Sequence, residues 1–198
     1  MSKVLLIIDM QNDFCPGGSL AVNGGNEIIP LITNMARDYK HVVLTQDWHP
    51  EGHLSFASQH AGHAAFTQID MPYGKQTLWP DHCIIGSHGA AFHDELDVPH
   101  AELIIRKGFR KSIDSYSAFF ENDHKTPTGL GGYLKERGFK KVTLVGLAFD
   151  YCVRYSAEDA VKLGLQVDVI EAATRAIDLG GTAAATKKSF AERGIALR

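Results

Sequence analysis

The chain has 198 residues, 44% of them apolar, and a formal net charge of −3 at pH 7. This length fits one domain with a sizeable core, so we expect a single domain over residues 1–198. The mild charge, with no basic run, gives no indication of a nucleic-acid or membrane partner. The apolar run at residues 4–8 is too short for a signal peptide, and the three cysteines show no CxxC spacing. We therefore expect a cytoplasmic protein without disulfides.

Apolar, β-branched runs predict five strands, in chain order at residues 4–8, 41–45, 103–105, 142–146 and 167–170. Helical spacing lies between or after them, at residues 28–35, 130–137, 150–164 and 181–193. In the first helix, Ile28, Leu31, Ile32 and Met35 are expected to share one face. Strands that alternate with helices predict βαβ units. The expected fold class is therefore α/β, with three α/β/α layers around a mostly parallel, doubly wound sheet.

Residues 49–100 depart from this alternation. They have weak periodicity, several Pro and Gly residues, and eight of the ten histidines. So long an irregular insert in a compact domain is more often functional than decorative. We expect this insert to contribute to binding metal or substrate.

Reactive side chains follow four of the predicted strands. Asp9 follows the first, Asp47 the second and Lys107 the third, and the fourth leads into Cys152. Ligands of an open parallel sheet bind beyond the carboxyl ends of its strands. Polar residues at strand ends are also common for structural reasons, but four with complementary chemistry point to one site.

Cys152 lies where the apolar run LVGLA gives way to helical spacing. Asp150 is a good N-cap, which predicts Cys152 in the first helical turn, where the dipole would lower its pKa. Asp9 could take the thiol proton and protonate a leaving group, while Lys107 balances its charge. Backbone N–H groups of Ala148 and Cys152 could form an oxyanion hole. These roles describe acyl transfer from an amide through a thioester.

A second constellation lies in TQDWHPEGH and LWPDHC. Asp47 and His49 are two residues apart at a strand end, so an extended chain points them the same way. His82 can join them from the insert, and His53 is a candidate further ligand. One carboxylate and two imidazoles suit zinc, iron or manganese better than calcium. We therefore expect one divalent metal ion as a cofactor.

The motifs IIDMQNDFCPGGSL, TQDWHPEGHLSFA, LWPDHC, RKGFRKSIDSYSAF and GLAFDYCV together resemble the series found in nicotinamidases, which are isochorismatase-like cysteine hydrolases. They occur in family order and span residues 4–153. The resemblance implies hydrolysis of nicotinamide to nicotinate and ammonia in NAD salvage. Activity on close analogues such as pyrazinamide is a family-level expectation.

The resemblance also implies a role for each candidate residue. Cys152 matches the family nucleophile, Asp9 its general base and acid, and Lys107 the third catalytic residue. Asp47, His49 and His82 match the family's metal ligands. In the family, the metal contacts the ring nitrogen of the substrate.

The substrate pocket and the loop before the nucleophile also follow the family pattern. Phe14, Trp79 and Tyr116 match the aromatic walls of the pocket. The family has a cis peptide before the alanine of the loop, here between Leu147 and Ala148. His53 sits where only some relatives use a histidine ligand, so its role stays open.

Two alternatives remain at this point. Another amide hydrolase of the superfamily, acting on a carbamoyl or ureido group, would keep the catalytic trio but generally lack the Asp-x-His pair and the distal histidine. A non-catalytic metal-binding domain would be expected to have lost the nucleophile or its base. The choice of metal and the oligomeric state, including a homo-oligomer, are left open by the sequence.

Overall fold

A computed structural model of the chain describes residues 3–198. Within this range the main sheet has six strands, and each neighbouring pair is parallel. In chain order they are β1 (Lys3–Ile8), β2 (Val42–Asp47), β5 (Leu103–Lys107), β6 (Lys141–Leu147), β7 (Gln166–Arg175) and β8 (Ala196–Leu197). Their spatial order is β5-β2-β1-β6-β7-β8, so the chain winds outward from β1 and then outward from β6. The predicted doubly wound sheet is confirmed.

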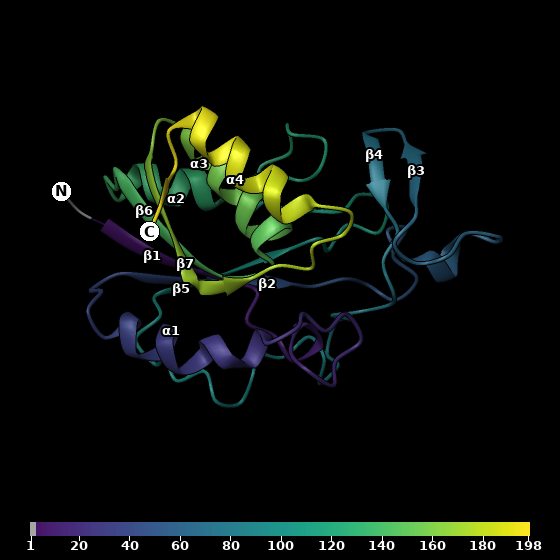
Figure 1. Cartoon of the computed structure of the whole chain (residues 1–198), viewed down its shortest axis with the longest axis horizontal. Helices are drawn as coiled ribbons and strands as arrows, with labels where there is room; N and C mark the ends of the chain where they lie inside the picture. Colours follow the sequence, from purple (N-terminus) through teal and green to yellow (C-terminus); the bar gives the residue numbers. More distant parts are fainter. Residues whose placement is uncertain (1–2) are drawn as a thin grey trace.

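Helices cover both faces of this sheet (Figure 1). The 3₁₀ turn η2 (Gly25–Ile28) and α1 (Ile29–Ala36) lie on one face. The other face carries α2 (Leu130–Glu136), α3 (Arg154–Lys162) and α4 (Thr182–Arg193). Side chains alternate across a strand, so Leu5 of β1 joins the core beneath α1, whereas Leu6 joins the core beneath the other helices. Burial on both faces explains the continuous apolar runs and confirms the three-layer fold.

The helix boundaries differ from the predictions in two places. Ile28 and Ile32 are buried, but Leu31 is 39% exposed, so the apolar face predicted for this helix is wrong at that position. The segment predicted as one helix over 150–164 begins with a π-helical turn, η4 (Phe149–Val153), before α3. Ala148 is the N-cap of η4, and no side chain caps it, so the N-cap assigned to Asp150 is also wrong.

The insert at residues 49–100 contains little regular structure. Short elements in this part of the chain are the 3₁₀ turn η3 (Ala57–Gln59) and the antiparallel hairpin of β3 (Gln68–Met71) and β4 (Gly74–Thr77). The sequence did not predict the hairpin, because its residues alternate only weakly in polarity. It stands beside the carboxyl ends of the main strands (Figure 1). The insert is therefore placed where a ligand of this fold class would bind.

Gly146 allows β1 and β6 to approach closely near their carboxyl ends. Its φ is +109°, and a Cβ at this position would lie 2.1 Å from the carbonyl oxygen of Ile8. Only glycine accepts both conditions. Across residues 3–198, no helix is long and apolar enough to cross a membrane. The single domain over 1–198 and the cytoplasmic location stay predictions.

Candidate active site

Four strand ends bring their side chains to one place in the sheet. Asp9 directly follows β1, and the loop after β6 leads to Cys152, so these two residues flank the point where the winding reverses. On the neighbouring strands, Asp47 at the end of β2 is in register with Lys107 at the end of β5. All four residues are buried. The side chains expected at the carboxyl ends of these strands therefore lie together, at the switch point of the sheet.

Lys107 is the centre of this group. Its Nζ lies 2.8 Å from Asp9 Oδ2 and 3.5 Å from Cys152 Sγ, and it donates a hydrogen bond to Ser115 O at 2.9 Å. Nζ also donates to Oδ1 of Asp47. Burial alone would lower the pKa of Lys107, but Asp47 and Asp9 outweigh it and raise this pKa well above its usual value. The ammonium therefore stays charged while it contacts both carboxylates and the thiol.

The Asp9 carboxylate is held on both of its oxygens. Thr45 Oγ1 donates to Asp9 Oδ1 at 2.6 Å and accepts from the Asp9 N–H at 3.1 Å, while Lys107 holds Oδ2. Asp9 has a φ of +46°, a conformation that non-glycine residues seldom adopt. Burial raises the pKa of Asp9, although Lys107 opposes this rise. A carboxyl group in this setting can both accept and return a proton.

Cys152 is 6% exposed and lines a pocket, and its sulfur lies within 4.8 Å of a carboxylate oxygen of Asp9. Burial raises the pKa of the thiol well above its usual value, and the charges of Asp9 and Asp47 add to this rise against the opposing Lys107. The expectation of a lowered pKa is therefore wrong. The sequence showed the helix start but not the loss of water around it or the two nearby carboxylates. At rest this group is a thiol and needs a base.

The predicted metal ligands also converge. Ligand atoms of Asp47, His49 and His82 all lie within 4.8 Å of one another. Nδ1 of His49 donates to Gly108 O at 2.9 Å, and Nδ1 of His82 donates to Pro80 O at 2.8 Å. Because a carbonyl can only accept, each Nδ1 carries a proton, and in the neutral imidazole the lone pair is then on Nε2. The two Nε2 atoms lie 3.7 and 3.9 Å from Asp47 Oδ2. Backbone carbonyls of this kind orient metal-binding histidines.

The pKa values of this triad shift in different directions. Burial would lower the pKa of His49, but the nearby Asp47 outweighs burial and raises this pKa above its usual value. Burial lowers the pKa of His82 to about 4, so its imidazole is neutral at pH 7. Burial would raise the pKa of Asp47, but Lys107 and His49 bring it below its usual value, so the carboxylate is charged. Among the described residues, His49 Nε2 is a buried nitrogen without a hydrogen-bond partner. An unpartnered nitrogen facing a carboxylate and a second imidazole fits zinc, iron or manganese.

The ring of His53 lies 4.5 Å from that of His49, but its nitrogens have partners outside the triad. Its Nε2 lies 2.9 Å from Arg110 O and 3.1 Å from Ile113 O, and its Nδ1 lies 2.8 Å from Ser55 Oγ. The ligand group found among the described residues does not include it. Because both ring nitrogens are engaged elsewhere, His53 holds the loop at residues 110–113 rather than a metal.

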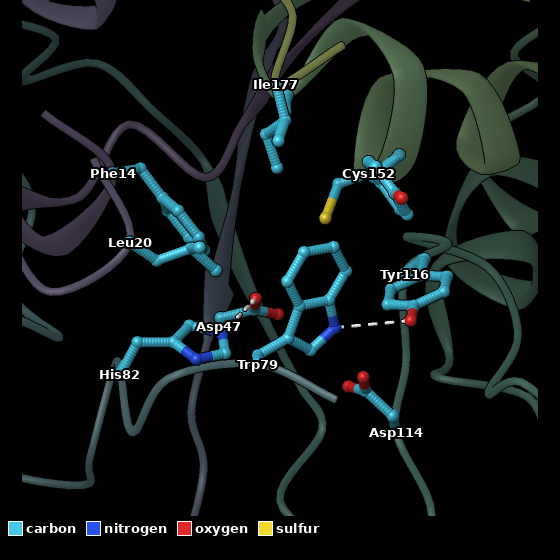
Figure 2. A pocket seen from close by; sticks show the side chains of 11 residues that line it. Phe14, Leu20, Asp47, Trp79, His82, Asp114, Tyr116, Cys152 and Ile177 are labelled. Atoms are coloured by element: carbon cyan, nitrogen blue, oxygen red, sulfur yellow. Dashed lines mark hydrogen bonds and ion pairs between the residues drawn. The ribbon is translucent and has the colours of Figure 1, made fainter. Parts of the chain in front are cut away.

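A pocket joins the thiol to the triad (Figure 2). Its lining residues are Phe14, Leu20, Asp47, Trp79, His82, Asp114, Tyr116, Ala148, Tyr151, Cys152 and Ile177. All three predicted aromatic walls are among them. Trp79 Nε1 donates to Tyr116 OH at 3.2 Å, which fixes the two rings edge to face. Mostly apolar walls with a few polar groups at the ends suit a flat aromatic ring that carries a carboxamide.

Some lining residues were not predicted. Asp114 lies two residues before Tyr116 in SIDSYSAF, and Tyr151 directly precedes Cys152 in FDYCV, so those motifs carried a signal for them. Behind the wall, Gln76 Nε2 donates to Asp114 Oδ2 and to Tyr116 OH, both at 2.9 Å. Ile177 had no local signal, because it enters the pocket from a loop far along the chain.

The loop before the nucleophile agrees with the family pattern. The Leu147–Ala148 peptide bond is cis. Ala148 and Cys152 both line the pocket. Their backbone N–H groups as an oxyanion hole stay a prediction.

The fold and site define an α/β protein in which a buried thiol, carboxylate and ammonium meet at the switch point of a parallel sheet. Residues 3–196 match the Isochorismatase domain family, and the chain belongs to it.

Named relatives lie close to this chain within the family. A nicotinamidase of Acinetobacter baylyi is 53% identical over 178 residues, which cover 90% of this chain and 83% of that protein. The solved structure of an Acinetobacter baumannii nicotinamidase/pyrazinamidase has a TM-score of 0.98 and 51% identity, covering 99% of this chain and 95% of that one. A Pyrococcus horikoshii pyrazinamidase, solved in complex with zinc, has a TM-score of 0.83 and 32% identity, covering 100% and 99%.

Proposed function

We propose that this chain is a nicotinamidase, a cysteine amidohydrolase that converts nicotinamide and water to nicotinate and ammonia in NAD salvage. The observation that carries the proposal is the position of Lys107, whose ammonium contacts Asp9, Cys152 and the triad residue Asp47. One buried cation thus contacts a thiol, its base and a metal-ligand set, and Cys152, Asp47 and His82 line one pocket. The names of the relatives agree with this chemistry.

The first half of the reaction forms a thioester. Asp9 takes the proton from the Cys152 thiol as the sulfur attacks the carboxamide carbon, and Lys107 balances the negative charge during this transfer. The backbone N–H groups of Ala148 and Cys152 hold the oxyanion. Asp9 then gives its proton to the amide nitrogen, the C–N bond breaks, and ammonia leaves.

The second half consumes water. Asp9 takes a proton from a water molecule as its oxygen attacks the thioester carbon. The C–S bond breaks, the proton returns to the Cys152 sulfur, and the product leaves as nicotinic acid, which gives its remaining proton to ammonia or solvent and becomes nicotinate. One water is used for each amide bond cleaved, and Asp9 ends in its starting state.

Two groups of residues place the substrate for these steps. Phe14, Trp79 and Tyr116 enclose the pyridine ring. A divalent ion of zinc, iron or manganese would be held by Asp47, His49 and His82, and when bound it supplies a Lewis acid for the ring nitrogen. The proposed partner is thus a small molecule, and a homo-oligomer and a cytoplasmic location stay predictions.

The test is ammonia release from nicotinamide by the wild type and by Cys152→Ala. Cys15→Ala is a matched control, because Cys15 is also a buried thiol (2% exposed) but does not line this pocket. We expect Cys152→Ala to lose at least about 10³-fold in turnover and the control to keep wild-type turnover. A chelator should reduce turnover, and added zinc, iron or manganese should restore it.

Each proposed element can fail separately in this experiment. Normal turnover by Cys152→Ala would remove the thiol from the mechanism. Turnover that survives complete removal of metal would restrict the triad to a structural role. No ammonia from nicotinamide with metal-replete wild type would contradict the substrate assignment and favour a carbamoyl or ureido amide.

A further inference from the structure

The side chain of Asp150 connects the nucleophile turn to a distant loop. Asp150 is 1% exposed and lies two residues before Cys152 in η4. Its Oδ1 accepts from the N–H of Ile177 at 3.0 Å, and its Oδ2 accepts from the N–H of Asp178 at 2.8 Å and from Thr182 Oγ1 at 2.5 Å. These three donors belong to the connection between β7 and α4 and to the first residue of α4. The carboxylate therefore binds this connection instead of capping its own helix.

The same connection supplies one wall of the pocket. Ile177 is half-buried, and its side chain projects into the pocket at the end where Cys152 lies (Figure 2). Asp47 and His82 lie toward the other end. Asp150 accepts a hydrogen bond from the backbone N–H of Ile177. This hydrogen bond fixes the position of the Ile177 backbone, from which the side chain extends into the pocket.

Apart from these hydrogen bonds, Ala176 and Ile177 pack against the two cores, but the turn that follows them projects outward. Asp178 has a φ of +55°, and Gly180 and Gly181 also have positive φ values, so the backbone turns sharply here. The Ala183 N–H donates to Asp178 Oδ1 at 3.1 Å, which ties the turn to α4 but not to the pocket. An amide at position 150 would offer one acceptor oxygen in place of two, so the backbone N–H of Ile177 or of Asp178 would lose its acceptor. Loss of the carboxylate would thus let the turn shift.

We propose that Asp150 is a positioning residue that holds Ile177 over the thiol end of the pocket, and that Ile177 limits the bulk a substrate carries next to its scissile carboxamide. This inference rests on the proposed function, because it takes the pyridine nitrogen to face the triad. The carboxamide then lies near Cys152, and the 4-position of the ring, which neighbours the ring carbon that bears the carboxamide, lies at the Ile177 end. The 6-position, which neighbours the ring nitrogen, lies at the triad end.

Two methylated substrates separate these ends of the pocket. We compare kcat/KM for nicotinamide, 4-methylnicotinamide and 6-methylnicotinamide with the metal-replete enzyme. Ratios between substrates do not depend on how much of a preparation is active, so a general loss of folded protein leaves them unchanged. One methyl group in an apolar pocket corresponds to about 10–200-fold in kcat/KM.

Ile177→Ala is expected to raise the relative kcat/KM for 4-methylnicotinamide about 10-fold, and Asp150→Asn to raise it in the same direction by a smaller factor. Neither variant should change the ratio for 6-methylnicotinamide by more than about 2-fold. Asp159→Asn is the matched control, because Asp159 is a carboxylate on α3 that is also buried (2% exposed) but lies outside this pocket. It should leave both ratios at the wild-type values. If Asp150→Asn does not fold, Thr182→Val removes one partner of Oδ2 and gives the milder form of the same change.

Equal losses on all three substrates in Asp150→Asn, with unchanged ratios, would overturn the positioning role. An unchanged 4-methyl ratio in Ile177→Ala would overturn the steric role. A second measurement covers failure of the proposed function: the rates at which iodoacetamide and the larger N-ethylmaleimide alkylate Cys152, followed by mass spectrometry of its peptide. If wild type does not hydrolyse nicotinamide but both variants speed the larger reagent relative to the smaller, the proposed substrate fails and the positioning role stands. If that relative rate is also unchanged, both fail.

Discussion

Removal of the charge of Lys107 is expected to destabilise the fold strongly. Lys107 is 1% exposed, and its Nζ lies between Asp9 and Asp47. Lys107→Met keeps most of the volume of the side chain but leaves two buried carboxylates without their cation. Loss of one partner of a buried ion pair costs about 3–5 kcal/mol. A slope of about 2 kcal/mol per molar urea converts this into a midpoint about 2 M lower.

The size of this loss depends on pH in a defined direction. In the wild type, Lys107 helps keep the pKa of Asp47 below its usual value, so Asp47 stabilises the fold above its unfolded-state pKa and this contribution is lost as pH falls. In Lys107→Met, burial raises the carboxyl pKa values against only the remaining opposition of His49 at Asp47 and of Thr45 at Asp9. A group with a raised folded-state pKa is most favourable at low pH and loses stability as pH rises. The difference between the two proteins should therefore be larger at pH 8 than at pH 5.

Urea unfolding of the chelator-treated proteins at these two pH values measures both effects. Lys75→Met is the matched control, because Lys75 pairs with Asp70 at the surface, with side-chain exposures of 67% and 80%. Exposed pairs contribute little, so its midpoint should move by less than about 0.3 M. A wild-type midpoint for Lys107→Met at pH 8, or a loss that grows toward pH 5, would refute the assignment of Lys107 as the counter-charge of these carboxylates.

Three further predictions concern the histidines. A Cβ at Gly108 would lie 2.4 Å from His49 Cε1, so Gly108→Ala should weaken zinc binding by about 10-fold or more in competition with a chromogenic chelator, and unchanged affinity would contradict this. Burial lowers the pKa of His82 from 6.5 to about 4, so the unfolded state gains a proton first as pH falls through this window. Between pH 6.5 and 4, the free energy of unfolding of the chelator-treated wild type should fall by up to about 1.4 kcal/mol per pH unit. His82→Asn should show a shallower fall in urea titrations, and parallel profiles for the two proteins would contradict this role of His82. His53→Gln should keep one bound zinc per chain but lower turnover, because His53 holds the loop at 110–113 rather than the metal; loss of the zinc would show that His53 is a ligand.

The convergence of the site was predictable because each part of it is local. A strand ends at a recognisable place, and the type of residue there can be read directly, as for Asp9 and Lys107. The two-residue spacing of Asp47 and His49 sets their common direction in an extended chain. His82 could be placed from its motif although it comes from the insert. None of these inferences depended on how deeply the side chains are buried.

The failures of prediction share a dependence on distant parts of the chain. Asp150 had the right residue type for an N-cap, but its acceptors are used by backbone groups more than 25 residues away, at Ile177 and Asp178. The helix dipole at Cys152 was a local inference, and burial next to two carboxylates outweighed it. His53 could not be separated from the metal ligands until the carbonyl groups around it were placed. Each error came from a local rule applied where tertiary contacts decide.

The raised pKa of Cys152 is consistent with the proposed reaction. Nicotinamide hydrolysis requires a proton for the leaving ammonia, and this site has to hold that proton before the substrate arrives. A thiolate formed in advance would already have lost its proton to solvent, and Asp9 would have none to give. Because burial raises the pKa of both Cys152 and Asp9, the proton is kept within the pair, and it passes to Asp9 only when sulfur attacks. Lys107 stays charged throughout and stabilises the negative charge that forms on sulfur as the proton passes to Asp9. Burial disfavours a free thiolate, and it therefore keeps on this pair the proton that the leaving group needs.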